Sequence, residues 1–361
     1  MEDKPILVLM CSGLAMRWAK IGVAKSIDDK IFEGIRLYVE GRKIHDYIRE
    51  EGEKTEKLAD DKVYVVQSKS GRLEVCDPDR VKNLAWGFPK GPRLIEYNMA
   101  EFKDGGGKEV VLVVSQRNKH HFEDVFGKDH GKWNPYKDLY VRYAYQCPNM
   151  DDIPKGTVEA ALAAYDITGG CTTIVCNGDD TYPGAFKELL KSENQPTNGM
   201  EIVTLGYKLG KVIPKESKGH AMAILMTDEH GKLKDCVEHD NLVWTETGKI
   251  KDAKTGEEFE PEIGASMNIM HFGRDAYRRM LDIHEFAIPY GNPAIMKRMF
   301  GRNEFLLPNF LAMVTGYSDI TCRVVPFSGE RFGLTYPSDL NDFGKAVIQF
   351  YHGGDPNKPI W

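Results

Sequence analysis

The sequence predicts an α/β fold built on a doubly wound, mixed sheet. Two observations lead to this prediction. Short and wholly apolar runs, such as 6–10 and 110–114, are typical of strands that are covered on both faces. Between such runs lie segments with helical spacing of apolar residues, such as 157–166. Strands that alternate with helices favour a sheet with parallel strands and helices on both sides.

The elements follow along the chain from their apolar patterns and from the turn residues between them. The expected strands are 6–10, 110–114, 172–177, 200–209, 220–228, 242–246, 267–272 and 321–326. The expected helices are 94–103, 157–166, 183–192, 275–286, 303–314 and a last helix that ends near 351. Pro308 interrupts or delays its helix, because proline lacks a backbone donor. Ser338 and Asp339 cap the last helix.

Residues 28–92 interrupt the alternation of strands and helices. Helical spacing of apolar residues over 29–52 predicts a helix, and the runs 62–67 and 72–76 flank a turn that predicts a β-hairpin. A chain of 361 residues could form one large domain or two ordinary ones. We interpret 1–361 as a single domain that carries 28–92 as an insertion.

The composition is that of a soluble globular protein, with 42% hydrophobic and 28% charged residues. A formal net charge of −6 argues against a nucleic-acid partner. The apolar runs are far shorter than the ~20 residues that a spanning helix needs, so we expect no membrane partner and a cytoplasmic protein. The seven cysteines form no CxxC pair, which favours reduced core or loop thiols. The sequence leaves the oligomeric state open, a homo-oligomer included.

The most informative stretch is the acidic end of the expected strand 172–177. Asn177, Gly178, Asp179 and Asp180 follow an apolar run directly. Ligands of open α/β sheets bind outside the carboxyl ends of strands, and paired carboxylates suit a hard cation such as Mg²⁺. The alternative is a turn, or the N-cap of the helix that begins near residue 183.

Two further segments carry candidate phosphate or base contacts. Gly13, Ala15 and Arg17 follow the first strand, where a loop of small residues brings backbone N–H groups close to phosphate oxygens. Arg17 and Lys25 could hold phosphate charge, although an isolated basic residue is more often a solvated surface group. Gly156 and Thr157 open an Ala-rich helix, where Thr157 could cap the helix or Gly156 could admit a base or ribose.

The order of these segments resembles the sugar-1-phosphate nucleotidyltransferases, a family with a Rossmann-like, GT-A-like fold. The motifs in the first half are Gly13-x-Ala15-x-Arg17 with Lys25, then Tyr145-Gln146, Gly156-Thr157-x-x-Ala160 and Asn177-Gly178-Asp179-Asp180. The motifs in the second half are Cys236-Val237-Glu238, Ser266-Met267-Asn268 and Pro337-x-Asp339-Leu340. The resemblance covers residues 5–27 and about 93–350, and it leaves the insertion 28–92 without a counterpart.

The resemblance implies an enzyme that transfers a nucleoside monophosphate from a nucleoside triphosphate to a sugar 1-phosphate or a similar phosphorylated metabolite. Pyrophosphate leaves, Mg²⁺ is the cofactor, and the product is an activated metabolite such as a nucleotide sugar. The implied catalytic residues are Arg17, Lys25 and Asp179, and the implied metal ligands are Asp179 and Asp180. The implied nucleotide-binding residues are Gly13, Ala15, Gln146, Gly156, Thr157 and Gly178, and the acceptor contacts are Glu238 and Asn268.

Several positions depart from the family pattern. Ala15 replaces a glycine of the phosphate loop, Glu159 stands where the family has Gly or His, and His239 replaces a lysine. The second metal-binding Asp of the family corresponds to Gly333. Two alternatives therefore stay open: a cytidylyltransferase that acts on a non-sugar phosphate such as phosphocholine, and a non-catalytic descendant that binds a nucleotide.

Overall fold

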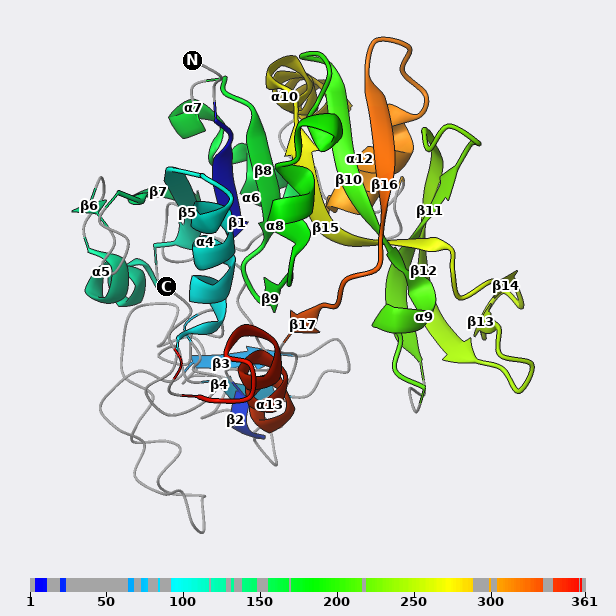
Figure 1. Cartoon of the computed structure of the whole chain (residues 1–361), viewed down its shortest axis with the longest axis horizontal. Helices are drawn as coiled ribbons and strands as arrows, with labels where there is room; N and C mark the ends of the chain where they lie inside the picture. Colours follow the sequence, from blue (N-terminus) through cyan, green and yellow to red (C-terminus); the bar gives the residue numbers. More distant parts are fainter. Residues whose placement is uncertain are drawn as a thin grey trace.

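Figure 1 shows the computed structural model of the chain. It describes residues 4–11, 20–23, 64–67, 73–76, 84, 92–116, 118–127, 131–132, 138–147, 155–168, 170–215, 219–287, 299, 304–333, 340–356 and 358. The predicted helix over 29–52 lies outside these residues, and so do Gly13, Ala15, Arg17 and Lys25.

The described residues form one large sheet with the strand order β14-β13-β12-β11-β15-β8-β1-β5-β7-β6, and β10 pairs with both β15 and β16. The strands of the first half are β1 Ile6–Met10, β5 Glu109–Ser115, β6 Gly131–Lys132, β7 Tyr140–Cys147 and β8 Thr173–Asn177. Those of the second half are β10 Glu201–Lys208, β11 His220–Thr227, β12 Leu233–Trp244, β13 Ile250–Asp252, β14 Glu258–Phe259, β15 Gly264–Phe272 and β16 Thr321–Phe327.

The sheet is mixed, as the sequence predicts. Strands β7, β5, β1 and β8 are parallel neighbours, and β10 runs parallel to β16. In contrast, β15 is antiparallel to β8, β10 and β11, and β11 to β12. The parallel half brings the carboxyl ends of four strands to one edge. The antiparallel half extends the sheet beyond β8 (Figure 1).

Helices cover both faces of the sheet (Figure 1), so the fold is doubly wound. Alternate residues of β1 point to opposite faces, because the side-chain period of a strand is two. Leu7 and Leu9 pack in one core with α4 (Leu94–Asp104), α5 (Lys119–Phe126) and α8 (Ala185–Leu189). Val8 packs in the other core with α6 (Thr157–Leu162), α10 (Arg274–Ala287) and α12 (Leu307–Val314).

Several predicted elements have different bounds in the structure. The helix expected over 157–166 is divided into α6 and α7 (Tyr165–Thr168), and α8 is followed by a 3₁₀ turn, η2 (Ser192–Asn194). Helix α12 begins at Leu307 with Pro308 in its first turn, which is the delay that the proline predicts. The last helix, α13, spans Leu340–Tyr351. Strand β7 and helix α5 are absent from the prediction, and β12 is longer than the predicted run 242–246.

The β-hairpin of the insertion is present. Strands β3 (Tyr64–Gln67) and β4 (Leu73–Cys76) pair antiparallel, and β2 (Lys20–Val23) pairs with the other edge of β4. The three strands form a sheet separate from the central one. The treatment of 28–92 as an insertion within a single domain stays a prediction.

Among the described residues, none of the helices has the length and the apolar character that a membrane span requires. Cys11, Cys171, Cys176, Cys236 and Cys322 are free thiols, and all but Cys171 are buried.

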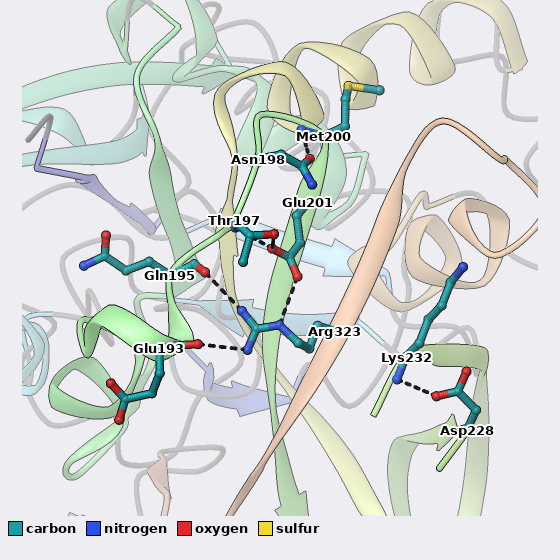
Figure 2. Close-up of polar contacts among 9 residues, drawn as sticks. All are labelled: Glu193, Gln195, Thr197, Asn198, Met200, Glu201, Asp228, Lys232 and Arg323. Atoms are coloured by element: carbon teal, nitrogen blue, oxygen red, sulfur yellow. Dashed lines mark hydrogen bonds and ion pairs between the residues drawn. The ribbon is translucent and has the colours of Figure 1, made fainter. Parts of the chain in front are cut away.

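A clamp around Arg323 of β16 joins segments that are distant in the sequence (Figure 2). The guanidinium donates to the Glu201 carboxylate at 2.9 Å and to the carbonyl oxygens of Glu193 and Gln195 at 3.3 and 3.0 Å. Thr197 donates its backbone N–H and its hydroxyl to the same carboxylate. The clamp therefore fixes the segment between η2 and β10 against β16.

Candidate functional site

The candidate site lies at the edge where the parallel strands end. Met10 of β1 is level with Asn177 of β8, and Ser115 of β5 with Cys147 of β7. Asp179 follows β8, and Gln146 lies near the end of β7. Since ligands of open α/β sheets bind at the carboxyl ends of parallel strands, these two predicted residues lie at the edge where a ligand is expected.

The antiparallel strands bring the predicted acceptor residues to the same edge. Strand β15 pairs with β8 through Met270 and Val175, so Asn268 lies two residues further towards the end of β8. Ala223 of β11 is level with Ser266 of β15 on one side and with Glu238 of β12 on the other. Along the sheet the predicted residues therefore follow the order Glu238, Asn268, Asp179, Gln146.

Asp179 and Asp180 have different surroundings although they are neighbours. Gly178 donates its N–H to the Met10 carbonyl at 2.9 Å, which ties the turn to the end of β1. Asp179 lies in this turn and is half-buried, whereas Asp180 is buried in β9 (Asp180–Thr181). The N-cap of α8 is Gly184, so neither carboxylate caps that helix.

Helix α4 holds the segment that follows the acidic turn. Asn98 donates to the Asp180 carbonyl at 2.7 Å and accepts from the Tyr182 N–H at 3.3 Å. The Gly184 N–H donates to both oxygens of Glu101 at 3.0 Å. Burial raises the pKa of Glu101 to about 7, although the bond from Gly184 opposes the rise. Sequence reasoning missed both side chains, because polar residues on a surface helix are usually solvated.

Arg331 is a third residue that sequence reasoning missed. Its guanidinium contacts Oδ1 of Asp180, and the Asn177 amide donates to Oδ2 at 3.3 Å. Arg331 precedes β17 (Phe332–Gly333), which pairs antiparallel with β9 so that Gly333 is level with Asp180. The position that the family pattern assigns to a second metal-binding Asp is thus a glycine beside an ion pair.

The residues of this turn fit a magnesium ion held by one carboxylate. Both Asp180 oxygens already accept bonds from protein donors. Among the described residues there is no cluster of three or more His, Cys, Asp and Glu that could hold a metal. Asp179 is the less buried carboxylate of the turn, and Mg²⁺ commonly takes one or two carboxylates with waters and substrate phosphates. A metal-binding role of Asp180 stays a prediction, and its ion pair opposes that role.

Asp179 also lies close to the chain that leads into the predicted phosphate loop. Burial, and after it the charge of Asp179, raise the pKa of the Cys11 thiol. Cys11 follows β1 directly and precedes Gly13 by two residues. The raised pKa keeps the thiol protonated, so Cys11 is no candidate nucleophile.

Gln146 and Gly156 are joined directly. The Gln146 amide donates to the Gly156 carbonyl at 2.8 Å. Gly156 has a φ of 120°, and a Cβ at this position would lie 2.7 Å from the backbone nitrogen of Phe305. Close approach of two backbones therefore requires the glycine here. Its predicted contact with a nucleotide stays a prediction.

The neighbours of Gly156 have structural partners. Glu159 accepts the Lys155 N–H at 3.1 Å and a bond from Gln146 at 3.4 Å, so its carboxylate closes the first turn of α6. The Thr157 hydroxyl accepts the Leu307 N–H at 2.8 Å, whereas the N-cap of α6 is Gly156. Thr157 therefore joins α6 to the beginning of α12.

Asn268 is strained in a way that often marks functional positions. With a φ of 55° it is the one non-glycine residue with a left-handed backbone in the described part of the chain. It lies where the β10–β15 register shifts, and its Oδ1 is buried with no hydrogen-bond partner among the described residues. Bulges and left-handed residues gather at binding sites, because the surrounding structure has to stabilise them.

His239 faces away from the predicted acceptor residues. Successive residues of a strand point to opposite faces, so His239 and its neighbour Glu238 lie on different sides of β12. The His239 ring is within 2.8 Å of the Asp252 carboxylate, and both side chains are buried. The residue that replaces the family lysine therefore belongs to the packing of β12 on β13.

Comparisons with known proteins find matches among solved structures. No protein-family model matches the chain, and no curated protein matches its sequence. Among solved structures, the chain is similar to a UDP-glucose pyrophosphorylase complexed with UDP-glucose, at 16% identity and a TM-score of 0.48 over 74% of this chain and 90% of that one. It is also similar to HddC from Yersinia pseudotuberculosis, at 12% identity and a TM-score of 0.45 over the same shares.

Proposed function

We propose that the protein is a nucleotidyltransferase that transfers a nucleoside monophosphate from a nucleoside triphosphate to a phosphorylated small metabolite, with release of pyrophosphate. One observation supports this proposal above the others. The motif residues that are scattered from Gln146 to Asn268 lie along one edge of the sheet, in the order Glu238, Asn268, Asp179, Gln146. This order suits an acceptor at one end, a metal in the middle and a base at the other end.

The chemistry needs no general base, because the attacking acceptor phosphate is already an anion. Catalysis would consist of positioning the two substrates and neutralising phosphate charge. Asp179 would hold Mg²⁺, which would neutralise the triphosphate and orient it. Arg17 and Lys25 would add positive charge, Gln146 and Gly156 would contact the base, and Gly13, Ala15, Thr157 and Gly178 would complete the nucleotide site.

The acceptor would bind beside Asn268 and Glu238. The buried Oδ1 of Asn268 offers a hydrogen-bond acceptor, and the Glu238 carboxylate is a second acceptor group. The small side chain of Ala223 separates Glu238 from Ser266 on the same face of the sheet. Hydroxyl groups of a sugar 1-phosphate would match acceptors arranged in this way, and we propose that class of acceptor.

The proposal is tested by incubating the protein with Mg²⁺, each nucleoside triphosphate and a panel of sugar phosphates, and measuring pyrophosphate. Release with at least one combination is the expected result. No release with any combination, from protein that is folded by circular dichroism, would contradict it. Phosphocholine in the same panel tests the cytidylyltransferase alternative, for which release would depend on CTP.

A non-catalytic nucleotide-binding protein is the second candidate. The ion pair that engages Asp180, together with Gly333 and Ala15, favours it, since each departs from the catalytic pattern. Calorimetry with nucleoside triphosphates separates the two candidates. Binding without pyrophosphate release in the panel would favour the second.

A further inference from the structure

We propose that Glu159 is a specificity-determining residue that selects guanine, so that the nucleotide of the proposed reaction is GTP. The inference rests on the proposed function, in which Gln146 and Gly156 contact the base. Glu159 is the only charged residue of α6, whose sequence is Thr-Val-Glu-Ala-Ala-Leu.

Glu159 lies within hydrogen-bond reach of the same side-chain nitrogen as Gly156. The Nε2 of Gln146 donates to the Gly156 carbonyl at 2.8 Å and to Oε2 of Glu159 at 3.4 Å. All three residues are only partly buried, so a ligand can approach them. A base that contacts both Gln146 and Gly156 is therefore adjacent to the Glu159 carboxylate.

The two oxygens of the Glu159 carboxylate have different surroundings. Oε2 accepts the Lys155 N–H at 3.1 Å in addition to the bond from Gln146. Oε1 accepts no hydrogen bond from any residue that the structure describes, and the Lys155 ammonium is 3.8 Å from it. The side chain of Glu159 is 26% exposed. Oε2 therefore holds the carboxylate in place, and Oε1 has lone pairs to offer to a ligand.

The base that suits this carboxylate is the one with two adjacent N–H donors. Guanine has a ring N–H beside its 2-amino group, and together these donors match the two oxygens of a carboxylate. The donor that reaches Oε2 would replace the long bond from Gln146.

The other bases would present acceptor atoms to the same carboxylate. Uracil has a single ring N–H between two carbonyl oxygens, and adenine and cytosine have an amino group beside an unprotonated ring nitrogen. The lone pairs of these acceptors would face a negative charge, which is a repulsive element against the wrong base. A site built to accept hydrogen bonds from its substrate also rejects analogues that lack the donors, because its own groups are then left unpaired.

The test measures the affinity of the full chain for nucleotides by titration calorimetry, with Mg²⁺ at pH 7.5 and without an acceptor. GTP should bind more tightly than ATP, CTP and UTP, on the order of 10²-fold. Inosine triphosphate, which differs from GTP only by the missing 2-amino group, should bind on the order of tenfold more weakly than GTP. This comparison uses the wild type, so it does not depend on the folding of a variant.

Glu159→Gln keeps the shape of the side chain and replaces one carboxylate oxygen by an NH₂ donor. It should bind GTP on the order of tenfold more weakly than the wild type does. It should also prefer xanthosine triphosphate to GTP, because the 2-oxo group of xanthine accepts a hydrogen bond from the new donor. Glu229→Gln is the matched control at a side chain that is 86% exposed, and it should keep wild-type affinity for GTP.

Three outcomes would overturn the inference: a wild type that binds GTP no more tightly than inosine triphosphate, a wild type that binds another of the four nucleotides more tightly than GTP, and a Glu159→Gln variant that keeps wild-type affinity for GTP. Selective GTP binding without pyrophosphate release would contradict the proposed function and support this inference. Pyrophosphate release with UTP in preference to GTP would do the reverse. Protein that binds no nucleotide would overturn both.

Discussion

At the scale of single residues, the two carboxylates of the acidic turn are not equivalent. Asp179 is half-buried beside the end of β1, and Asp180 is buried in an ion pair. The motif places them side by side, but Asp180 is the more buried of the two and its carboxylate is paired with Arg331. We therefore propose Asp179 as the principal metal ligand.

Replacing Asp179 by Asn should abolish Mg²⁺-dependent turnover and leave the fold intact. The amide keeps the shape of the side chain and removes its charge, so the loss of rate should be at least about 10²-fold. Pyrophosphate release measures the rate, and thermal unfolding measures stability. Asp166→Asn, an exposed position on α7, is the matched control. Near-normal turnover of Asp179→Asn would show that the metal assignment is wrong.

Gly156 provides a second prediction at this scale. Gly156→Ala should lower the free energy of unfolding by about 3 kcal/mol or more, because it adds a backbone clash with Phe305 to the strain of a positive φ. Gly127→Ala is the control: its φ is 86° but a Cβ there meets nothing within 4 Å, so about 1 kcal/mol of strain is expected. Equal losses in urea unfolding would exclude the clash.

At the scale of elements, the Arg323 clamp fixes a connection that no regular structure supports. Its three acceptors come from the segment before β10 and from β10 itself (Figure 2). Burial works against ionisation of Glu201, but donors from Thr197 and then from Arg323 lower its pKa. A charged donor shared by several acceptors is among the stronger contributions of hydrogen bonds to stability.

Arg323→Ala should destabilise the protein by about 2–3 kcal/mol, since it removes the counter-charge of the Glu201 carboxylate and the donor to two carbonyl oxygens. Lys234→Ala is the control. It removes a side chain that is 59% exposed and that pairs with Asp228, and it should cost less than about 1 kcal/mol. Urea unfolding of both variants measures the difference. A loss for Arg323→Ala no larger than that for Lys234→Ala would show that the clamp contributes little.

At the scale of the whole molecule, Glu101 connects α4 to the beginning of α8, because its carboxyl group accepts the Gly184 N–H, and this carboxyl group has a raised pKa. Glu101 goes from an ordinary value of 4.5 to about 7 on folding, mainly through burial. The folded protein therefore binds more protons than the unfolded chain between these values. This group's contribution to stability is complete below about pH 4.5 and is lost as the pH rises through about 7.

Glu101→Gln should remove this pH dependence. Relative to the wild type, the variant should gain about 1–3 kcal/mol of stability between pH 5 and pH 8, because the wild type has to ionise a buried carboxyl and the variant does not. Urea unfolding at several pH values gives the difference directly. A difference that stays constant across this range would contradict the assignment.

Most of the central sheet and its helices could be predicted from the sequence, because apolar periodicity reports burial directly. Strand β7 was missed, since Arg142 and Gln146 interrupt its apolar pattern. The position of Asp179 at a strand end was predictable from the run before it. Arg331, Asn98 and Glu101 were not, because nothing in a charged or polar side chain's local sequence indicates a distant partner.

The sequence by itself determined most of the segments that form the central strands and their helices, that Pro308 delays a helix, and that an acidic turn follows β8. These features depend on residues that are close along the chain. Only the tertiary structure decided that Asp180 is paired with Arg331. Arg331 meets Asp180 because β17 pairs with β9 in a register that sets Gly333 level with Asp180. Packing between distant segments sets that register, so the local pattern does not contain it.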